Sequence, residues 1–296
     1  MSAPAREGYL PISGARLYVR EVGRGAPLVV LHGGPDFNHR YLLPELDELA
    51  RDFRLVYYDQ RGRGKSSNGV APEDVSIDSE IDDLDQVRRR LGLDSIAVLG
   101  HSWGCVLALE YATRLPHRVS QLILLNTAPV SREDSVALVR HRVRNEAAQL
   151  AAMRDAAMTE EFAAGDIEAD ARYYRAHFGA AVRRPEQLEP LVSRLRADFT
   201  PDDILKAREI ETRLYAQTWQ VPGYDLVPGL SRLDAPALVV HGEFDFIPVE
   251  FAERVAAAMP NARLEVLPEC GHFSYLEQPV AVHDAVRTFM DGGGTR

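Results

Sequence analysis

One segment constrains the fold of this chain more than any other: residues 100–104, with the sequence GHSWG. An apolar run, residues 96–99, leads directly into it, and a helix-like run, residues 105–114, follows it. A serine on a sharp turn between a strand and a helix is a nucleophile elbow, in which the residues two positions away must be small so that strand and helix can approach. This pattern predicts that the hydroxyl of Ser102 is exposed at the carboxyl edge of a sheet.

An acid and a histidine follow two other strand-like runs. Asp245 lies just after residues 237–241, and His272 follows residues 264–267. Because the carboxyl ends of parallel strands meet at one edge of a sheet, where ligands bind, we expect both side chains to lie near Ser102. The chain order serine, acid, histidine is the order that sheet enzymes with this elbow use.

These three residue types together predict nucleophilic catalysis. A neutral serine hydroxyl is a poor nucleophile until an imidazole takes its proton. We therefore expect His272 to act as the general base for Ser102, and Asp245 to fix the orientation and tautomer of that imidazole. Dehalogenases and epoxide hydrolases of such a fold attack with an aspartate at the elbow, so the serine argues against both.

An oxyanion that forms in the transition state needs hydrogen-bond donors, and two backbone N–H groups are candidates. One belongs to Trp103, which follows the predicted nucleophile. The other belongs to Gly34, in the loop 32–35 that follows an apolar run, residues 28–31. Removing one such donor typically lowers the rate by a factor of roughly 10²–10³.

Strand-like and helix-like runs alternate along much of the chain. Residues 8–12 and 16–22 predict a β-hairpin, and strands and helices then follow in turn. Such alternation indicates βαβ units and a mostly parallel sheet, so the predicted fold class is α/β. The further predicted strands are residues 53–58, 96–100 and 121–126, and the predicted helices are residues 41–51, 77–91 and 105–114.

The strand signals stop after the sixth main strand and helical signals replace them. Thr200, followed by a proline and two aspartates, is a typical residue to begin a helix. We expect a helical cap over residues 130–232, inserted into a core formed by residues 1–129 and 233–296. Aromatic side chains of the cap are expected to form its own core and in part to line an apolar pocket over the nucleophile.

The segment 59–66, DQRGRGKS, ends like a phosphate-binding loop. That motif requires a glycine five residues before Gly64, and Asp59 stands there instead. We therefore expect no nucleotide site in this segment. Asp59 and Arg61 are expected to pair with each other and to hold the loop.

Three motifs carry a resemblance to a known family: HGGP at residues 32–35, DQRGRGKS at residues 59–66 and HSWG at residues 101–104. On these motifs the chain resembles the α/β-hydrolase family, and within it the proline iminopeptidase branch, over residues 8–129 and 233–290. The resemblance implies the α/β-hydrolase fold, with a mostly parallel eight-stranded sheet, flanking helices and an inserted helical cap. It implies the same catalytic triad and oxyanion hole as above: Ser102, Asp245 and His272, with Gly34 and Trp103.

The chain departs from this branch where the substrate is selected. Iminopeptidases of the family usually continue the oxyanion loop with a further glycine, whereas this chain has Asp36 after the proline. They also carry glutamates that pair with the substrate ammonium, in the cap and in some members directly after the triad aspartate, where this chain has Phe246. Asp36, Glu209 and Glu211 are candidates for binding an amine, with solvated surface carboxylates as the alternative. Phe246 and Trp219 complete the candidate substrate-binding residues.

Composition excludes several classes of partner. The formal net charge is −10, from 34 basic and 44 acidic side chains, which argues against nucleic acid or an anionic membrane surface. No run approaches the roughly 18 apolar residues of a membrane helix, and residues 1–8 lack the apolar core of a signal peptide. We expect a cytoplasmic protein without a metal or other cofactor, since no acid or cysteine stands at ligand spacing from the histidines. The oligomeric state stays open.

These features predict a cofactor-independent serine hydrolase that forms an acyl-enzyme on Ser102. The first expectation is a proline iminopeptidase-like aminopeptidase that releases N-terminal residues from short peptides. A carboxylesterase or lactonase with the same machinery is the alternative. A cofactor-free perhydrolase or oxygenase, or a non-catalytic ligand receptor, is the second alternative, because fold and motif set the machinery and not the substrate.

Overall fold

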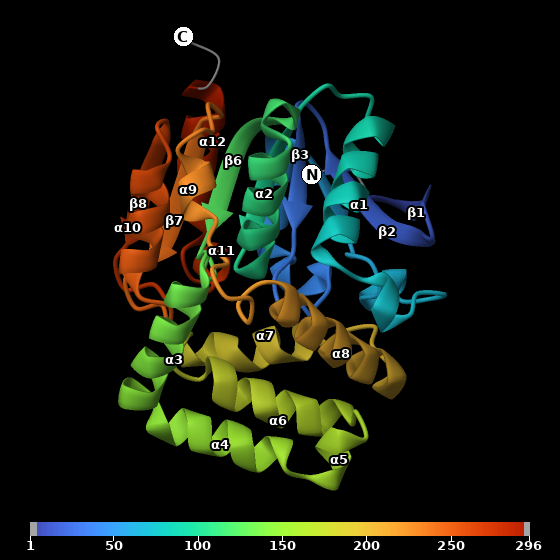
Figure 1. Cartoon of the computed structure of the whole chain (residues 1–296), viewed down its shortest axis with the longest axis vertical. Coiled ribbons are helices and arrows are strands. Elements are labelled where there is room, and N and C mark those ends of the chain that lie inside the picture. The colour runs from blue at the N-terminus through green and yellow to red at the C-terminus, as the bar shows by residue number, and fades with distance from the viewer. Residues whose placement is uncertain (1–4, 293–296) are drawn as a thin grey trace.

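One sheet of eight strands forms the centre of the computed structural model, which describes residues 5–292 (Figure 1). Its strands are β1 Arg6–Ile12, β2 Ala15–Gly23, β3 Pro27–Leu31, β4 Arg54–Tyr58, β5 Ile96–His101, β6 Val119–Leu125, β7 Ala237–Gly242 and β8 Ala262–Leu267. They follow the order β1-β2-β4-β3-β5-β6-β7-β8 across the sheet. The pairs β1–β2 and β2–β4 are antiparallel and the other pairs are parallel, so the predicted mostly parallel sheet is confirmed. Residues 1–4 and 293–296 of the predicted core lie outside the described residues.

Helices cover both faces of this sheet (Figure 1). The helices α1 (Ile77–Arg90), α2 (Trp103–Arg114) and α10 (Val249–Ala258) contribute to the core on one face. The helices α11 (Ser274–Glu277) and α12 (Pro279–Gly292) contribute to the core on the other. Short 3₁₀ helices lie in the connections: η1 His39–Leu42, η2 Glu45–Arg51, η3 Gly64–Ser66, η4 Pro72–Asp74, η5 Pro116–Arg118 and η6 Pro185–Gln187.

Alternate residues of the central strands enter two separate cores. In β3, Val29 and Leu31 belong to the core with α1, α2 and α10, whereas Leu28 and Val30 belong to the core with α11 and α12. Both faces of the sheet are therefore covered, which is why the central strands read as continuous apolar runs. Burial on both faces also fixes the position of β5, and with it the position of the elbow that follows.

The prediction of one helix over residues 41–51 is wrong. The chain forms the two 3₁₀ helices η1 and η2 there, separated by Leu43 and Pro44. Leu43 is extended, with φ −101° and ψ 152°. A proline ring disfavours the helical conformation of the preceding residue, and Pro44 has no N–H to donate. The other predicted strands and helices are present and differ only at their ends.

Between β6 and β7 the described chain is helical, and most of these helices lie beyond the carboxyl ends of the strands (Figure 1). The side chain of Thr200 accepts a hydrogen bond from the N–H of Asp203, so Thr200 begins α8 as predicted. We interpret residues 130–232 as a cap inserted into the core. Its helices are α3 Arg132–Asn145, α4 Ala147–Ala157, α5 Glu160–Ala163, α6 Ile167–Phe178, α7 Leu188–Leu195, α8 Pro201–Gln217 and α9 Val227–Leu230.

The predicted pair between Asp59 and Arg61 is wrong. Asp59 Oδ1 lies 2.6 Å from His39 Nδ1, and Arg61 Nε donates to Asp83 Oδ2 over 2.9 Å. The partners belong to segments that are about 20 residues away in the sequence and reach the loop only through the tertiary structure. The loop is thus fixed to η1 on one side and to α1 on the other.

Candidate active site

Ser102 occupies a strained turn between β5 and α2. Its φ of 55° and ψ of −117° lie in a region that residues other than glycine rarely adopt. The N–H of Ser102 donates to the carbonyl of Leu125 over 3.0 Å, and its own carbonyl accepts from the N–H of Cys105 over 2.9 Å. Such strain persists only where the surroundings hold the backbone in place, as these bonds to β6 and α2 do.

The two glycines of the elbow allow α2 to lie close to β5 and to β3. A Cβ atom on Gly100 would stand 2.5 Å from the carbonyl carbon of Gly104. A Cβ atom on Gly104 would stand 2.3 Å from the carbonyl oxygen of Leu31. No side chain fits at either position, so the expected reason for small residues in this motif is confirmed.

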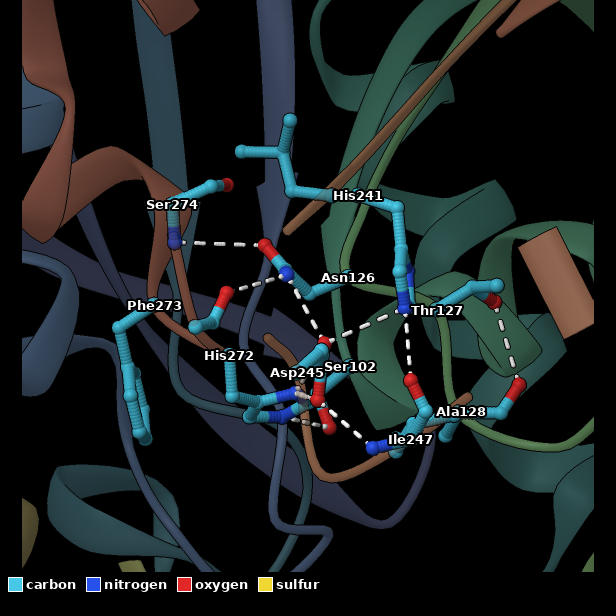
Figure 2. A network of polar contacts seen from close by, with 12 residues as sticks. Ser102, Asn126, Thr127, Ala128, His241, Asp245, Ile247, His272, Phe273 and Ser274 are labelled. Atoms are coloured by element: carbon cyan, nitrogen blue, oxygen red, sulfur yellow. Dashed lines mark hydrogen bonds and ion pairs between the residues drawn. The ribbon is translucent and has the colours of Figure 1, made fainter. Parts of the chain in front are cut away.

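The structure brings the three residues of the predicted triad together (Figure 2). His272 Nε2 lies 3.1 Å from Ser102 Oγ. His272 Nδ1 lies 2.9 Å from Asp245 Oδ2 and 3.0 Å from Oδ1. Asp245 follows β7 and His272 follows β8, so both reach Ser102 from loops at the carboxyl edge of the sheet. This arrangement allows the imidazole to take the serine proton, which remains the predicted role.

The carboxylate of Asp245 is held in its ionised form. Oδ1 accepts from the N–H of Ile247 and Oδ2 from Asn126 Nδ2, each over 2.9 Å (Figure 2). Burial raises the pKa of Asp245, but the charges of His272 and His241 and the hydrogen bonds from His272 and from the N–H of Ile247 outweigh it and lower the pKa to about 2. The carboxylate can therefore balance an imidazolium that forms on His272.

Asn126 is a residue of this site that the sequence did not reveal. Its φ of 51° is left-handed, a conformation that asparagine tolerates better than most residues. Besides Asp245, its Nδ2 donates to the carbonyl of Gly271 over 3.0 Å, and its Oδ1 accepts from the N–H of Ser274 over 3.3 Å. Asn126 thus ties the end of β6 to both loops of the triad (Figure 2). One feature of the sequence could have indicated Asn126: it is a polar residue directly after an apolar strand-like run, and such residues lie at the same edge of the sheet as Ser102.

Two buried histidines beside the elbow are fixed in their neutral form. His32 Nε2 accepts from the N–H of Gln60 over 3.0 Å, and its Nδ1 donates to the carbonyl of Gly33 over 2.9 Å. His101 Nε2 donates to the carbonyl of His272 over 3.0 Å and its Nδ1 accepts from the hydroxyl of Tyr41 over 2.7 Å. Burial is the main cause that lowers the pKa of each histidine to about 3.

We expect the free energy of unfolding to fall as the pH drops from 6.5 towards 4. The unfolded chain takes up protons at His32 and His101 in this range, whereas the folded protein does not. Each histidine then lowers stability by up to about 1.4 kcal/mol per pH unit. Urea denaturation at pH 7.5, 6 and 5 measures the slope. His101→Gln should reduce it and the exposed control His117→Gln should not, while equal slopes for His101→Gln and the wild type would contradict the expectation.

The two predicted oxyanion donors belong to the first residue of α2 and to the loop after β3. Trp103 is the first residue of α2, so no carbonyl of a preceding helical turn is there to accept a hydrogen bond from its N–H. Gly34 has a φ of 118°, and a Cβ atom there would stand 2.3 Å from the N–H nitrogen of Asp36. The neighbouring N–H of Gly33 is bonded to the hydroxyl of Tyr41 over 2.7 Å. The oxyanion role of Gly34 and Trp103 stays a prediction.

A cavity of about 380 Å³ opens above Ser102, between the sheet edge and the cap. Its wall is mainly aromatic, as a site for a largely apolar ligand would be. Loops of the core and the helices α3, α6 and α8 contribute to it. The aromatic side chains are Phe37, Tyr41, Tyr173, Tyr174, Phe178, Tyr215, Trp219, Phe246 and Phe273, and the charged or titratable ones are Asp36, His101, Arg142, His177, Glu211 and His272.

Asp36 lines this cavity but is already engaged. Its Oδ2 accepts from the hydroxyl of Tyr174 over 2.6 Å and forms an ion pair with Arg196. Arg196 also donates through Nε to Asp170 over 2.7 Å. Asp36 Oδ1, in contrast, is buried and has no hydrogen-bond partner among residues 5–292. The two oxygens of this carboxylate therefore differ in their contacts.

Glu211 lines the cavity and Glu209 does not. Glu211 Oε1 accepts from the hydroxyl of Tyr215 over 2.7 Å, while Glu209 is exposed. Burial and the charge of Asp36 raise the pKa of Glu211 to about 8, although the Tyr215 hydrogen bond opposes the shift. The sequence contains a feature that distinguishes Glu211 from Glu209, because residue 211 continues the helical spacing of the buried residues 204, 207 and 214.

The two predicted aromatic residues also lie on the cavity wall. The Phe246 ring packs against His272, with ring centroids 4.6 Å apart. The Trp219 ring packs edge-on against Trp103 at 5.3 Å, and its Nε1 donates to the carbonyl of Pro129 over 2.8 Å. Both are positioned to contact a ligand, and that contact stays a prediction.

Neither a metal cluster nor a membrane span is found in the described part of the chain. Within residues 5–292, no three His, Cys, Asp or Glu side chains gather as the ligands of a metal ion would. No helix in this range combines the length and the apolar character needed to cross a membrane.

Comparison with known proteins gives consistent matches. The family model described as "alpha/beta hydrolase fold" matches residues 26–279. A proline iminopeptidase of Lactobacillus delbrueckii subsp. lactis is 30% identical over 92% of this chain and 93% of its own length. The crystal structure of a proline iminopeptidase-related protein from Thermus thermophilus is 28% identical, covers 98% of both chains and superposes with a TM-score of 0.71. An esterase from Rhodococcus sp. ECU1013 shares the fold, with 24% identity over 97% of this chain and 98% of its own and a TM-score of 0.73.

Proposed function

This chain belongs to the α/β-hydrolase family, and we propose that it is a serine hydrolase that works through an acyl-enzyme on Ser102. The family model and the similar proteins identify the chain as a hydrolase, with relatives among the proline iminopeptidases. The observation that carries the mechanism is the contact of 3.1 Å between His272 Nε2 and Ser102 Oγ. Both side chains reach the cavity, where a substrate carbonyl has access to the hydroxyl.

The proposed reaction has two halves. Ser102 Oγ attacks the carbonyl carbon while His272 Nε2 takes its proton, and the N–H groups of Gly34 and Trp103 stabilise the oxyanion. His272 returns the proton to the leaving group as the carbon–nitrogen or carbon–oxygen bond breaks, and the acyl group remains on the serine. Water, activated by the same imidazole, then releases the acid. Asp245 stays ionised throughout and balances the charge on His272.

We further propose that the substrate is a short peptide with a free amino terminus, which makes the protein an aminopeptidase of the proline iminopeptidase type. Two carboxyl groups support this choice, those of Asp36 and Glu211 on the cavity wall. Asp36 Oδ1 lacks a hydrogen-bond partner among the residues that the structure describes, and a buried acceptor without a donor is costly. An ammonium group of the substrate would supply that donor.

Glu211 supports the same choice through its protonation. With a pKa of about 8, the carboxyl group is largely neutral in the cavity at pH 7. A cation beside it would favour the ionised form, since opposite charges at short range lower the pKa of an acid. The site would thus accept a cationic amine without leaving an unpaired buried charge when no amine is bound.

The second candidate is a carboxylesterase or lactonase with a neutral acyl group. One observation favours it: Arg196 already pairs with Asp36, so the charge of this carboxylate is balanced without a substrate. Phe246 after the triad acid likewise adds apolar surface where an amine-binding glutamate could stand. In this case the aromatic wall alone would select the acyl group.

A paired assay separates the two candidates. The purified protein is incubated with prolyl p-nitroanilide, with its N-acetylated form and with a short-chain p-nitrophenyl ester. Cleavage of the amide that acetylation prevents supports the aminopeptidase. Cleavage of the ester alone supports the esterase and overturns the peptide assignment.

Glu211→Gln is expected to lower kcat/KM on prolyl p-nitroanilide by about 30-fold, or about 2 kcal/mol, mainly through KM. Glutamine keeps the hydrogen bond to Tyr215 and the volume of the side chain but cannot ionise. Turnover of a neutral p-nitrophenyl ester should fall far less. Glu209→Gln is the matched control, because this residue lies on the exposed side of the same helix. Equal losses on the amide and the ester would mean that Glu211 only supports the shape of the cavity.

A further inference from the structure

We propose that the leaving-group side of the cavity binds a carboxylate through Arg142, so that the preferred substrates are short peptides with a free C-terminus. The peptide nature of the substrate rests on the function proposed above. The carboxylate site itself rests on separate observations, which concern the wall of the cavity beyond His272.

The position of His272 decides which side of the cavity receives the leaving group. Its Nε2 lies 3.1 Å from Ser102 Oγ and must return the proton to the leaving atom. The leaving group therefore lies beside His272, and the acyl group lies towards the oxyanion loop at Gly34. Because Phe246 packs on the His272 ring at 4.6 Å and lines the cavity, the wall around Phe246 faces the leaving group.

Arg142 stands on this wall. Its Cζ lies 4.9 Å from the centroid of the Phe246 ring, and the residue is 8% exposed. Nε donates to Glu146 Oε2 over 2.8 Å and Nη2 lies 3.7 Å from Met153 Sδ, whereas no hydrogen bond within residues 5–292 uses Nη1. A guanidinium has five N–H donors, so this one has donors left for an anion in the cavity.

His177 adds a second polar group to the same wall. Its ring centroid is 5.6 Å from that of Phe246, and its Nδ1 is buried without a hydrogen-bond partner in the described part of the chain. Burial and the charge of Arg142 lower the pKa of His177 well below its ordinary value, so the ring is neutral and retains one N–H. A carboxylate in the cavity could accept hydrogen bonds both from the remaining donors of Arg142 and from the His177 ring.

The balance of charge favours a substrate with two free termini. Glu146 already neutralises Arg142, so an anion alone would bring an uncompensated charge into the cavity. A peptide with two free termini is itself neutral, and its ammonium, at Glu211, brings a positive charge into the cavity together with the carboxylate at Arg142. One guanidinium that holds two carboxylates has a precedent in this protein, at Arg196.

The test compares peptides that differ only at the C-terminus. Prolylglycine, prolyldiglycine and prolyltriglycine are each assayed as the free acid and as the amide. For at least one length we expect the wild-type protein to prefer the acid by 10-fold or more in kcat/KM, mainly through KM. Arg142→Gln should bring this ratio close to 1, and Arg142→Lys should retain part of it. Arg144→Gln, on the exposed side of the same helix, should keep the wild-type ratio.

A purely structural role for Arg142 predicts a different result. Removing it would then lower kcat/KM for the acid and the amide alike and leave their ratio unchanged, which would overturn the proposal. If Arg142→Gln fails to fold because it leaves Glu146 unpaired, the double variant with Glu146→Gln removes both charges and gives the same ratio test.

The outcomes also separate this proposal from the aminopeptidase function. Ser102-dependent cleavage of prolyl p-nitroanilide without any preference for free C-termini would refute the carboxylate site and leave the function standing. If the wild-type protein cleaves no amide, the aminopeptidase function fails. The role of Arg142 is then tested with two esters, 4-acetoxyphenylacetate and 4-acetoxyphenylacetamide, which differ only in the charge of the leaving group. Equal rates of hydrolysis for the two esters would overturn the proposed carboxylate site.

Discussion

Ser102→Ala is expected to abolish turnover of every substrate, with a loss in kcat of about 10⁴- to 10⁶-fold. The substitution removes Oγ, the atom that faces His272 Nε2 at 3.1 Å. The fold should not change, because the strained backbone at position 102 is held by bonds of its own N–H and carbonyl, which alanine keeps. Steady-state kinetics measures the loss, and thermal unfolding shows whether the variant is folded.

The control for this variant is another serine of the same cavity. Ser135 lines the cavity on α3 and is separated in the chain from the elbow and from both triad loops. Ser135→Ala should stay within about threefold of the wild type. If Ser102→Ala retained more than about one hundredth of the activity, the acyl-enzyme mechanism would have to be abandoned.

Asp245→Asn is expected to lower kcat by about 10⁴-fold. Both oxygens of Asp245 accept hydrogen bonds, from the N–H of Ile247, from Asn126 Nδ2 and from His272 Nδ1. An asparagine offers one acceptor oxygen only, so its amino group must face one of these donors. Where it faces His272, the imidazole adopts the other tautomer, and Nε2 then carries a proton and cannot take one from Ser102.

The measurement for Asp245→Asn is kcat together with stability in urea. Glu243→Gln is the matched control, because it changes an exposed carboxylate of the same loop after β7 and should leave kcat near the wild-type value. A small loss for Asp245→Asn, below about 10-fold in kcat, would show that another acid orients the imidazole. Loss of folding instead of activity would show that the role of Asp245 is structural.

The elbow and the triad could be predicted because their requirements are local. The turn at Ser102 needs small residues at positions 100 and 104, and this requirement is visible in the sequence as a short motif. The acid and the histidine each follow an apolar run, and parallel strands bring such positions to one edge whatever the length of chain between them. The one error in the predicted elements, residues 41–51, also had a local cause in Pro44.

The polar partners in the cavity could not be predicted in this way. From the sequence alone, Asp36 is either a solvated carboxylate or part of an amine-binding site. Only the folded chain shows that Arg196, 160 residues away, pairs with it. Glu209 and Glu211 are two residues apart, so on a helix they point about 200° apart and only one can face the cavity. The spacing of the apolar residues of α8 favours Glu211, but its contact with the cavity is seen only in the folded chain.

The sequence by itself determined the fold class, the position of the elbow serine and the loops that carry Asp245 and His272, since each follows from a local backbone requirement or from the period of a strand. The tertiary structure decided which partner each buried charged side chain contacts: Asn126 for Asp245, Arg196 for Asp36, and the Phe246 ring for Arg142. These contacts arise where the cap meets the carboxyl edge of the sheet or where separate loops meet there. The energies of these contacts depend on burial and on charges from distant segments. Neither the burial nor the distant charges can be deduced from a short stretch of the sequence.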